Sequence, residues 1–126
     1  DMSDPEANKA VARRYMKALI DGDISTIEGL QHPDVKWWIL GFGDMDRATF
    51  VGAIASGLMT AEKREAEIPG LTAEGDRVAV ECHAKMTFVG GKVYANEYHN
   101  LLVIRDGLIV EGREYMDTRA SAAAFG

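Results

Sequence analysis

Residues 77–118 constrain the fold of this chain more than any other stretch. They hold three long runs of strand-forming residues, and two glycine-containing turns, Gly90-Gly91 and Asp106-Gly107, separate these runs. This spacing predicts three antiparallel strands that two hairpins connect. Because successive side chains of a strand point to opposite faces, the register of each hairpin decides which residues share a face.

The first hairpin is interpreted with a tight turn at Gly90-Gly91. This turn would place His83 opposite Tyr98 and Glu81 opposite Asn100. These four side chains would then lie on the same face of the sheet.

The second hairpin has two candidate turns. A two-residue type I′ turn at Asp106-Gly107 would place Leu102 opposite Glu111, whereas a three-residue loop over 105–107 with a bulge would place Leu102 opposite Val110. The pairing of apolar residues favours the bulge.

With this register, one face of the sheet is polar at one end and apolar at the other. The polar end comprises Glu81, His83, Asn96, Tyr98, Asn100 and Glu114, and the apolar end Ala79, Leu102, Ile104, Leu108 and Val110. An apolar floor that leads into a polar cluster is typical of a pocket. A sheet with one solvated face has a similar alternation, and the pattern alone favours that interpretation.

The opposite face carries Val78, Val80, Cys82, Leu101, Val103 and Ile109. Two faces with apolar residues both need cover, so we expect helices on one face and a second subunit on the other. The sequence therefore predicts a homodimer through Val80, Leu101 and Val103.

The first half of the chain predicts three helices. Ser3-Asp4-Pro5-Glu6 is typical of a helix start, and an apolar stripe that includes Tyr15 continues to Gly22. Asp23 is expected to cap a second, short helix, and Asp46 a third helix over 47–59.

Two further strands are expected between and after these helices. In the strand over 35–40 the adjacent Trp37 and Trp38 must point to opposite faces, and the inner one either packs in the core or forms an aromatic wall for a ligand. The strand over 62–72 is expected to be interrupted at Pro69-Gly70. The fold class is therefore α+β, with three N-terminal helices on a strongly curved antiparallel sheet that encloses a conical pocket.

Size and charge exclude several classes of function. The 126 residues are expected to form one domain, 1–126. The net charge of −6, without a run of Lys or Arg, argues against nucleic acid and anionic membranes as partners. Since no apolar run approaches the roughly 20 residues of a membrane span and no signal-peptide profile is present, a cytoplasmic location is the default expectation.

The segments VARRYMKALIDGDISTIEGL and YANEYHNLLVIRDGLIVEGREYMDT resemble the nuclear transport factor 2-like, or SnoaL-like, superfamily. This resemblance covers nearly the whole chain and implies a cone-shaped α+β fold of the cystatin-like barrel type. The superfamily includes isomerases, cyclases, dehydratases, epoxide hydrolases and non-catalytic binding domains, so the resemblance is specific for the fold and not for the reaction.

Comparison with individual branches of the superfamily implies roles for single residues. Tyr15 stands where ketosteroid isomerases carry an oxyanion-hole tyrosine, but Ile39 stands where they have their aspartate base. The arginine and two aspartates of limonene-epoxide hydrolases fall on Glu81, His83 and Glu114. Their pocket positions fall on Asn96, Tyr98 and Met116, and their water-holding residues on Trp37 and Ile39. SnoaL-type polyketide cyclases, which use a His/Asp pair, are most similar in residue types.

The polar cluster predicts acid–base chemistry on a hydrophobic carbonyl compound. His83, oriented by Glu81 or Glu114, is the expected general acid or base, or else Glu114 acts as an acid with a pKa that burial raises. Tyr98 is expected to donate a hydrogen bond to a developing enolate. The expected substrate-binding residues are Tyr15, Trp37, Ile39, Asn96 and Met116.

No cofactor or metal is expected, because His32, His83 and His99 have no recognised ligand spacing. Two alternatives stay open. The domain either binds an apolar ligand or a partner protein without catalysis, or the polar residues only form a network that fixes the sheet.

Overall fold

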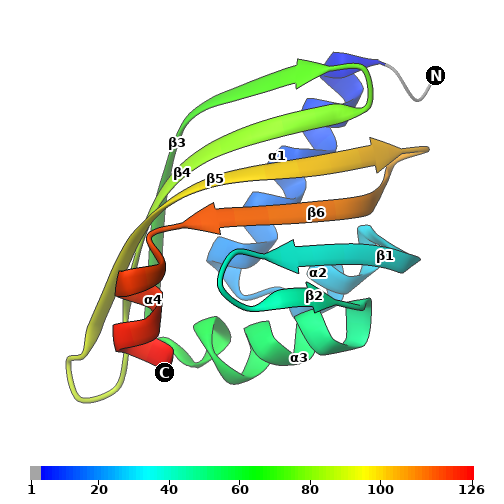
Figure 1. Cartoon of the computed structure of the whole chain (residues 1–126). Helices are drawn as coiled ribbons and strands as arrows, with labels where there is room; N and C mark the ends of the chain where they lie inside the picture. Colours follow the sequence, from blue (N-terminus) through cyan, green and yellow to red (C-terminus); the bar gives the residue numbers. More distant parts are fainter. Residues whose placement is uncertain (1–3) are drawn as a thin grey trace.

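The computed structural model describes residues 4–126 and shows helices packed against one six-stranded, strongly bent sheet (Figure 1). The helical elements are α1 (Pro5–Asp21), α2 (Ile24–Gly29), α3 (Arg47–Ser56), the single 3-10 turn η1 (Leu58–Thr60) and α4 (Thr118–Phe125). The strands are β1 (Gln31–Ile39), β2 (Gly43–Met45), β3 (Lys63–Glu74), β4 (Arg77–Thr87), β5 (Val93–Arg105) and β6 (Leu108–Met116). The predicted α+β class is confirmed.

The sheet has the strand order β2-β1-β6-β5-β4-β3 and is mixed rather than fully antiparallel. Strands joined by short turns pair antiparallel, but β1 comes early in the chain and pairs in parallel with the late strand β6. The prediction of an antiparallel sheet was therefore wrong at this one pair. The predicted interruption of β3 is present as a register shift between Glu67 and Gly70.

Side-chain caps fix the predicted helix starts. Asp4 accepts hydrogen bonds from the backbone N–H groups of Glu6 and Ala7, and α1 ends at Gly22 in the left-handed region. Asp23 caps α2 and Asp46 caps α3 in the same way. Ser3, the first residue of the predicted helix start, lies outside the described residues.

The register of the first hairpin differs by one residue from the prediction. The Phe88 N–H donates to the Lys92 carbonyl at 2.8 Å, so the loop has three residues, 89–91. His83 therefore pairs with Glu97, and Cys82 pairs with Tyr98. Since a one-residue slip moves every side chain to the other face, His83 and Glu81 lie opposite to the face expected for them.

This register is the one that buries the apolar residues of β4. Val78, Val80 and Cys82 face the helices and are fully buried, whereas the predicted register places them on the opposite, dimer-forming face. The predicted dimer surface was therefore wrong for Val80. The driving force is burial of apolar area, which is lost if this row of side chains faces solvent.

The second hairpin combines features of both candidate turns. Arg105 pairs with Leu108 across a two-residue turn in which Asp106 and Gly107 have φ of 52° and 78°, as a type I′ turn requires. A bulge occurs, but at Val110, between the pairs Ile104–Ile109 and Val103–Glu111. Beyond the bulge Asn100 pairs with Glu114, so the expectation that Tyr98, Asn100 and Glu114 share a face holds.

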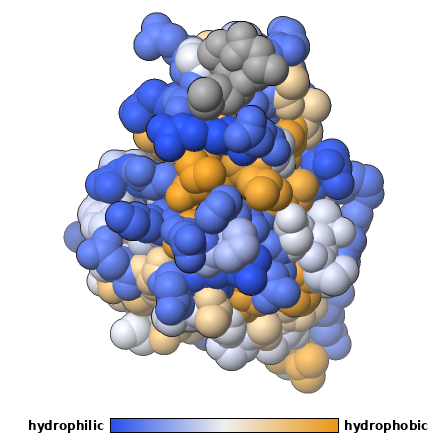
Figure 2. Space-filling view, turned by 90° about the vertical axis from the view of Figure 1, so that its right-hand side faces the viewer, coloured by the Kyte–Doolittle hydropathy of each residue, from blue (hydrophilic) through white to orange (hydrophobic). Residues whose placement is uncertain are grey.

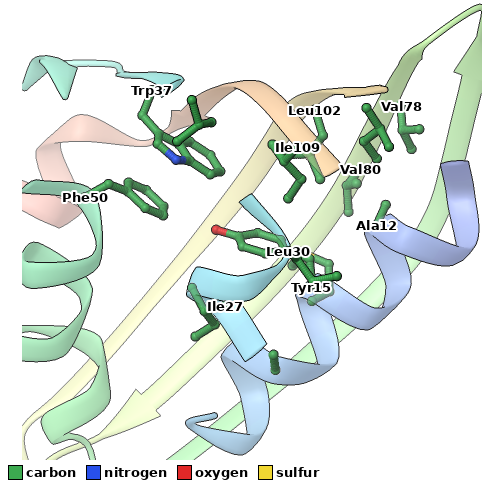
Figure 3. Packing of buried hydrophobic residues seen from close by; sticks show 14 of the residues in the cluster. Ala12, Tyr15, Ile27, Leu30, Trp37, Phe50, Val78, Val80, Leu102 and Ile109 are labelled. Atoms are coloured by element: carbon green, nitrogen blue, oxygen red, sulfur yellow. The ribbon is translucent and has the colours of Figure 1, made fainter. Parts of the chain in front are cut away.

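The core lies between the inner face of the sheet and α1, α2 and α3 (Figure 3). Trp37 is at its centre, stacked on Phe50 with ring centroids 3.8 Å apart, and its Nε1 donates to Gln31 Oε1 at 2.8 Å. Trp38 points to the opposite face, where the Arg113 guanidinium lies 4.2 Å from its ring centroid. Of the two roles left open for the inner tryptophan, core packing is the one the structure shows.

Figure 2 shows one side of the molecule, where hydrophilic residues cover most of the surface and a band of hydrophobic residues crosses it. Within residues 4–126, no helix has the length and apolar character needed to cross a membrane.

Candidate functional site

Two cavities lie between the inner face of the sheet and the helices. The inner chamber has a volume of about 60 Å³ and is lined by apolar residues of α1 and η1 and by β3, β4 and β5. The outer chamber has a volume of about 330 Å³ and lies between β1, α3 and α4. Three residues line both chambers: Leu58, Tyr98 and Glu114. The two chambers therefore meet at Tyr98 and Glu114.

Glu114 is the ionisable group at this junction. It projects from β6 toward the helices, opposite Asn100 of β5. Its side chain is partly buried among apolar residues, and this desolvation disfavours the charged form and raises the pKa from the ordinary value of 4.5 to about 7. A carboxyl group with this pKa can both accept and release a proton near neutral pH.

Tyr98 is held beside Glu114 by a short hydrogen-bonded chain. The hydroxyl groups of Tyr98 and Tyr94 are 2.8 Å apart, and Asn96 Nδ2 donates to the Tyr94 hydroxyl at 2.7 Å. Burial, together with the hydrogen bond to Tyr94, raises the pKa of Tyr98. Tyr98 therefore stays protonated and can act as a hydrogen-bond donor.

Asn96 supports this chain but lines neither chamber. Its amide closes the junction between β5 and α4, because Asp117 N–H donates to Asn96 Oδ1 at 3.0 Å and Asn96 Nδ2 donates to the Asp117 carbonyl at 3.0 Å. Asn96 thus positions Tyr94, and the expected direct contact with a substrate does not follow from the structure.

His83 and Glu81 are not part of this site. They lie on the outer face of the sheet, where His83 Nδ1 is 3.1 Å from Glu97 Oε1 and His83 Nε2 is 3.7 Å from Glu81 Oε2. His83 opens onto a broad polar hollow that also contains Glu65 and Lys85. The expected pairing of His83 with Glu114 was therefore wrong, because the sheet separates the two side chains.

The expected substrate-binding residues divide into two groups. Ile39 and Met116 line the outer chamber, as expected. Tyr15 and Trp37 pack against each other in the core, with ring centroids 5.9 Å apart, and line neither chamber. The Tyr15 hydroxyl is buried without a hydrogen-bond partner among residues 4–126, and burial raises its pKa well above the ordinary value.

Some residues that line the two chambers or hold Tyr98 in place were not predicted as site residues from the sequence. Asn100 was predicted in the polar cluster without a role, and Tyr94 was not named. They lie two and four positions from Tyr98 on the same strand, so the alternation of β5 is the signal for both. Leu58 was predicted within a third helix over 47–59, but α3 ends at Ser56 and Leu58 lies in the 3-10 turn that follows it. Phe125 was not missed, because the Ala-rich tail after Thr118 predicts a last helical turn that reaches the pocket rim through this residue. In α4 it lines the outer chamber and packs edge-on against Tyr94, with ring centroids 4.9 Å apart.

Cys82 lines the inner chamber and is not suited to be a nucleophile. Burial raises the pKa of its thiol, and the nearby Glu114 raises it further. Within the described part of the chain, no group of three or more His, Cys, Asp and Glu side chains lies close enough together to hold a metal ion.

Solved structures with the same fold include two proteins from Streptomyces species and the protein TerC. The wild-type IdmH of Streptomyces antibioticus, a putative polyketide cyclase, is 24% identical, with a TM-score of 0.79 over 94% of this chain and 98% of that chain. AclR of Streptomyces galilaeus, a putative hydroxylase, is 22% identical, with a TM-score of 0.80 over 92% and 82%. TerC, crystallised with polyporic acid, is 21% identical, with a TM-score of 0.77 over 94% and 97%.

These similarities show the cone-shaped fold of nuclear transport factor 2-like proteins. No curated protein sequence matches the chain at a significant level. The model of the SnoaL-like domain matches residues 12–112, which begin within α1 and include most of the sheet. The chain therefore belongs to the SnoaL-like domain family.

Proposed function

We propose that this protein is a cofactor-independent acid–base enzyme that moves a proton next to a carbonyl group of a hydrophobic small molecule. The observation that carries this proposal is Glu114, a carboxyl group with a pKa raised to about 7 at the junction of two largely apolar cavities. Such a group is suited to general acid–base catalysis near neutral pH.

The arrangement of the chamber walls supports a simple sequence of steps. The Glu114 carboxylate takes a proton from the carbon next to the carbonyl, and the electron pair of the C–H bond forms an enolate. In this step the Tyr94 hydroxyl donates to the Tyr98 oxygen, so the single proton of Tyr98 is free to form a hydrogen bond with the enolate oxygen. The protonated Glu114 then returns its proton to the ligand. Alternatively, the enolate carbon forms a new C–C bond with a second carbonyl carbon, the π electrons of that carbonyl move to its oxygen, and the resulting alkoxide takes the proton from Glu114.

The outer chamber supports the choice of ligand. Its volume of about 330 Å³ is in the range of pockets for small molecules, roughly 300–1,000 Å³. Apolar and aromatic side chains form most of its wall, among them Phe42, Phe50, Met116 and Phe125. The similarity to a putative polyketide cyclase and to a protein crystallised with polyporic acid agrees with a ligand of this kind.

The test is the exchange of α-protons for deuterium in simple ketones such as acetophenone and cyclohexanone, followed by NMR in D₂O. The wild-type protein is expected to accelerate exchange, with a rate that rises with pH and levels off above pH 7, because the ionised Glu114 is the base. Glu114→Gln is expected to reduce the acceleration by about 10²- to 10⁴-fold.

His83→Ala and Glu81→Gln are the matched controls, because both change ionisable groups on the outer face of the same sheet. They are expected to leave the exchange rate unchanged. Exchange that survives in Glu114→Gln, or that is lost in His83→Ala, contradicts the proposal.

A binding domain without catalysis is the second candidate. It is favoured by the position of His83, which leaves Glu114 without the imidazole partner that the sequence predicts. This candidate predicts that ketones raise the melting temperature of the wild type and of Glu114→Gln alike, with no deuterium exchange in either.

The outer face of the sheet supports a proposed homodimer. Leu101 of β5 and Ala79 of β4 lie partly exposed on this face, away from the helices, whereas Val103 on the same face is already buried within the chain. Leu101→Glu would place a charge in the interface and is expected to give monomers, whereas the wild type is expected to be a dimer at micromolar concentration. Sedimentation velocity measures both, and a monomeric wild type rules out the dimer.

A further inference from the structure

We propose that the inner chamber binds a short side arm of the same ligand, and that this arm ends in a hydrogen-bond donor such as a hydroxyl group. The inference rests on the proposed function in one respect, since it takes Glu114 as the point at which the ligand reacts. It concerns the part of the ligand that lies beyond this point.

The two chambers are placed so that one ligand occupies both. Leu58, Tyr98 and Glu114 line each of them, so a ring in the outer chamber with its carbonyl at Tyr98 and Glu114 has the inner chamber directly beside it. A substituent on that ring can extend past Leu58 toward α1.

The volume of the inner chamber limits the arm. One water molecule needs roughly 10–15 Å³ of such volume, so about 60 Å³ holds roughly four to six water-sized groups, which suits a short chain. The wall is mostly apolar, and it includes Met16, Met59 and Met86, whose flexible side chains adapt to the shape of an alkyl chain.

Asn100 determines what the end of the arm must be. It is 6% exposed and lines the inner chamber, and its Oδ1 has no hydrogen-bond partner among residues 4–126. A buried acceptor without a donor lowers stability. Glu114, its neighbour across the strands, cannot supply a proton when it is ionised.

The cationic side chain in the wall of the inner chamber already donates hydrogen bonds to backbone carbonyls. Arg64 lines the inner chamber, but its Nε donates to the Ile20 carbonyl at 3.1 Å and its Nη1 to the Ala61 carbonyl at 3.0 Å. These bonds hold β3 to the end of α1. A hydroxyl group on the ligand is therefore the donor that suits Asn100.

Four acetophenones test this inference by calorimetry in ordinary water, where α-proton exchange leaves the ketone unchanged and only binding is measured. The probes are acetophenone without an arm, and acetophenones with a propyl, 2-hydroxyethyl or methoxymethyl arm at ring position 3, on the carbonyl side of the ring, from which the arm can reach the inner chamber. The three arms have about the same length, but only the hydroxyethyl arm can donate a hydrogen bond. The wild type is expected to bind it roughly tenfold more tightly than the other two.

Asn100→Leu keeps the volume of the side chain and removes the acceptor. It is expected to abolish the preference for the hydroxyethyl arm, so that the propyl arm binds at least as tightly. Equal binding of the three arms by the wild type, or a preference that persists in Asn100→Leu, overturns the inference.

Two cavity-filling variants locate the arm. Ala84→Leu fills the inner chamber and is expected to weaken the three probes with arms and not acetophenone, whereas Ala53→Leu narrows the outer chamber and is expected to weaken all four alike. If Ala84→Leu does not fold, Ala66→Leu on β3 fills the same chamber. Loss of acetophenone binding in the inner-chamber variant overturns the assignment.

These outcomes are separate from the test of catalysis. Glu114→Gln that retains deuterium exchange contradicts the proposed function, whatever the pattern of binding. An absent preference for the hydroxyethyl arm contradicts only the inner-chamber subsite.

Discussion

Gly112→Ala is expected to lower the free energy of unfolding by about 3 kcal/mol. Gly112 lies on β6 directly beneath the Trp37 ring, and a Cβ atom at this position would overlap that ring, with Cη2 only 2.6 Å away and other ring atoms closer. The ring cannot move aside easily, because it is stacked on Phe50 and its Nε1 is bonded to Gln31. The strain must be taken up by the backbone of the sheet or by the core.

Gly52→Ala is the matched control. A Cβ atom at Gly52, within α3, would meet nothing within 4 Å, so the same substitution is expected to be neutral or to stabilise by about 0.5–1 kcal/mol. Urea unfolding of both variants measures the difference. If Gly112→Ala is as stable as the wild type, the Trp37 ring does not pack tightly against β6 at Gly112.

Glu114→Gln is expected to be more stable than the wild type at pH 8, by up to about 3 kcal/mol. The folded protein holds a proton on Glu114 up to a pKa of about 7, whereas the unfolded chain loses it near 4.5. The folded state therefore binds more protons between these values, and the stability of the wild type falls as the pH rises from about 4.5 to about 7. Above this range the cost of the buried charge is fully present.

The comparison at two pH values identifies this cause. At pH 4.5–5 Glu114 is protonated in the folded state, so Glu114→Gln and the wild type are expected to have similar free energies of unfolding. Glu81→Gln, which removes an exposed carboxyl from the outer face, is expected to have little effect at either pH. If the free energies of unfolding of Glu114→Gln and the wild type differ by the same amount at pH 5 and pH 8, the titration of Glu114 is not the cause of the difference.

Local sequence signals were sufficient for most of the fold. Asp4, Asp23 and Asp46 mark helix starts because a carboxylate can bond the free N–H groups of the first turn, and this depends on neighbouring residues alone. The interruption of β3 at Pro69-Gly70 also depends on neighbouring residues alone. The parallel pairing of β1 with β6 was not accessible in this way, because it joins segments that are far apart in the chain.

The candidate site depended on hairpin register, which local signals leave open. Gly90 and Gly91 both have positive φ and suit a two-residue turn, but the protein uses a three-residue loop. The row Val78, Val80 and Cys82 held the deciding information, since three alternating apolar residues favour the face that the helices cover. The prediction that this row forms a dimer surface turned β4 over, and His83 was therefore wrongly predicted in the site.

Glu114 was placed correctly for a different reason. The actual turn at Asp106-Gly107 is one residue shorter than the loop expected, and the bulge at Val110 shifts the register further in the same direction. The two shifts leave Glu114 on the same face as Tyr98 and Asn100. The site in the structure therefore contains the predicted carboxyl group of Glu114 and the predicted phenol of Tyr98, but not the predicted imidazole of His83.

The most direct test of the account is an NMR titration of the Glu114 side-chain carboxyl carbon, assigned by the loss of its signal in Glu114→Gln. The account predicts a midpoint near pH 7, because burial at the junction of the two chambers disfavours the carboxylate. A midpoint near the ordinary value of 4.5 would show that Glu114 is well solvated, and would contradict its role as the acid–base group.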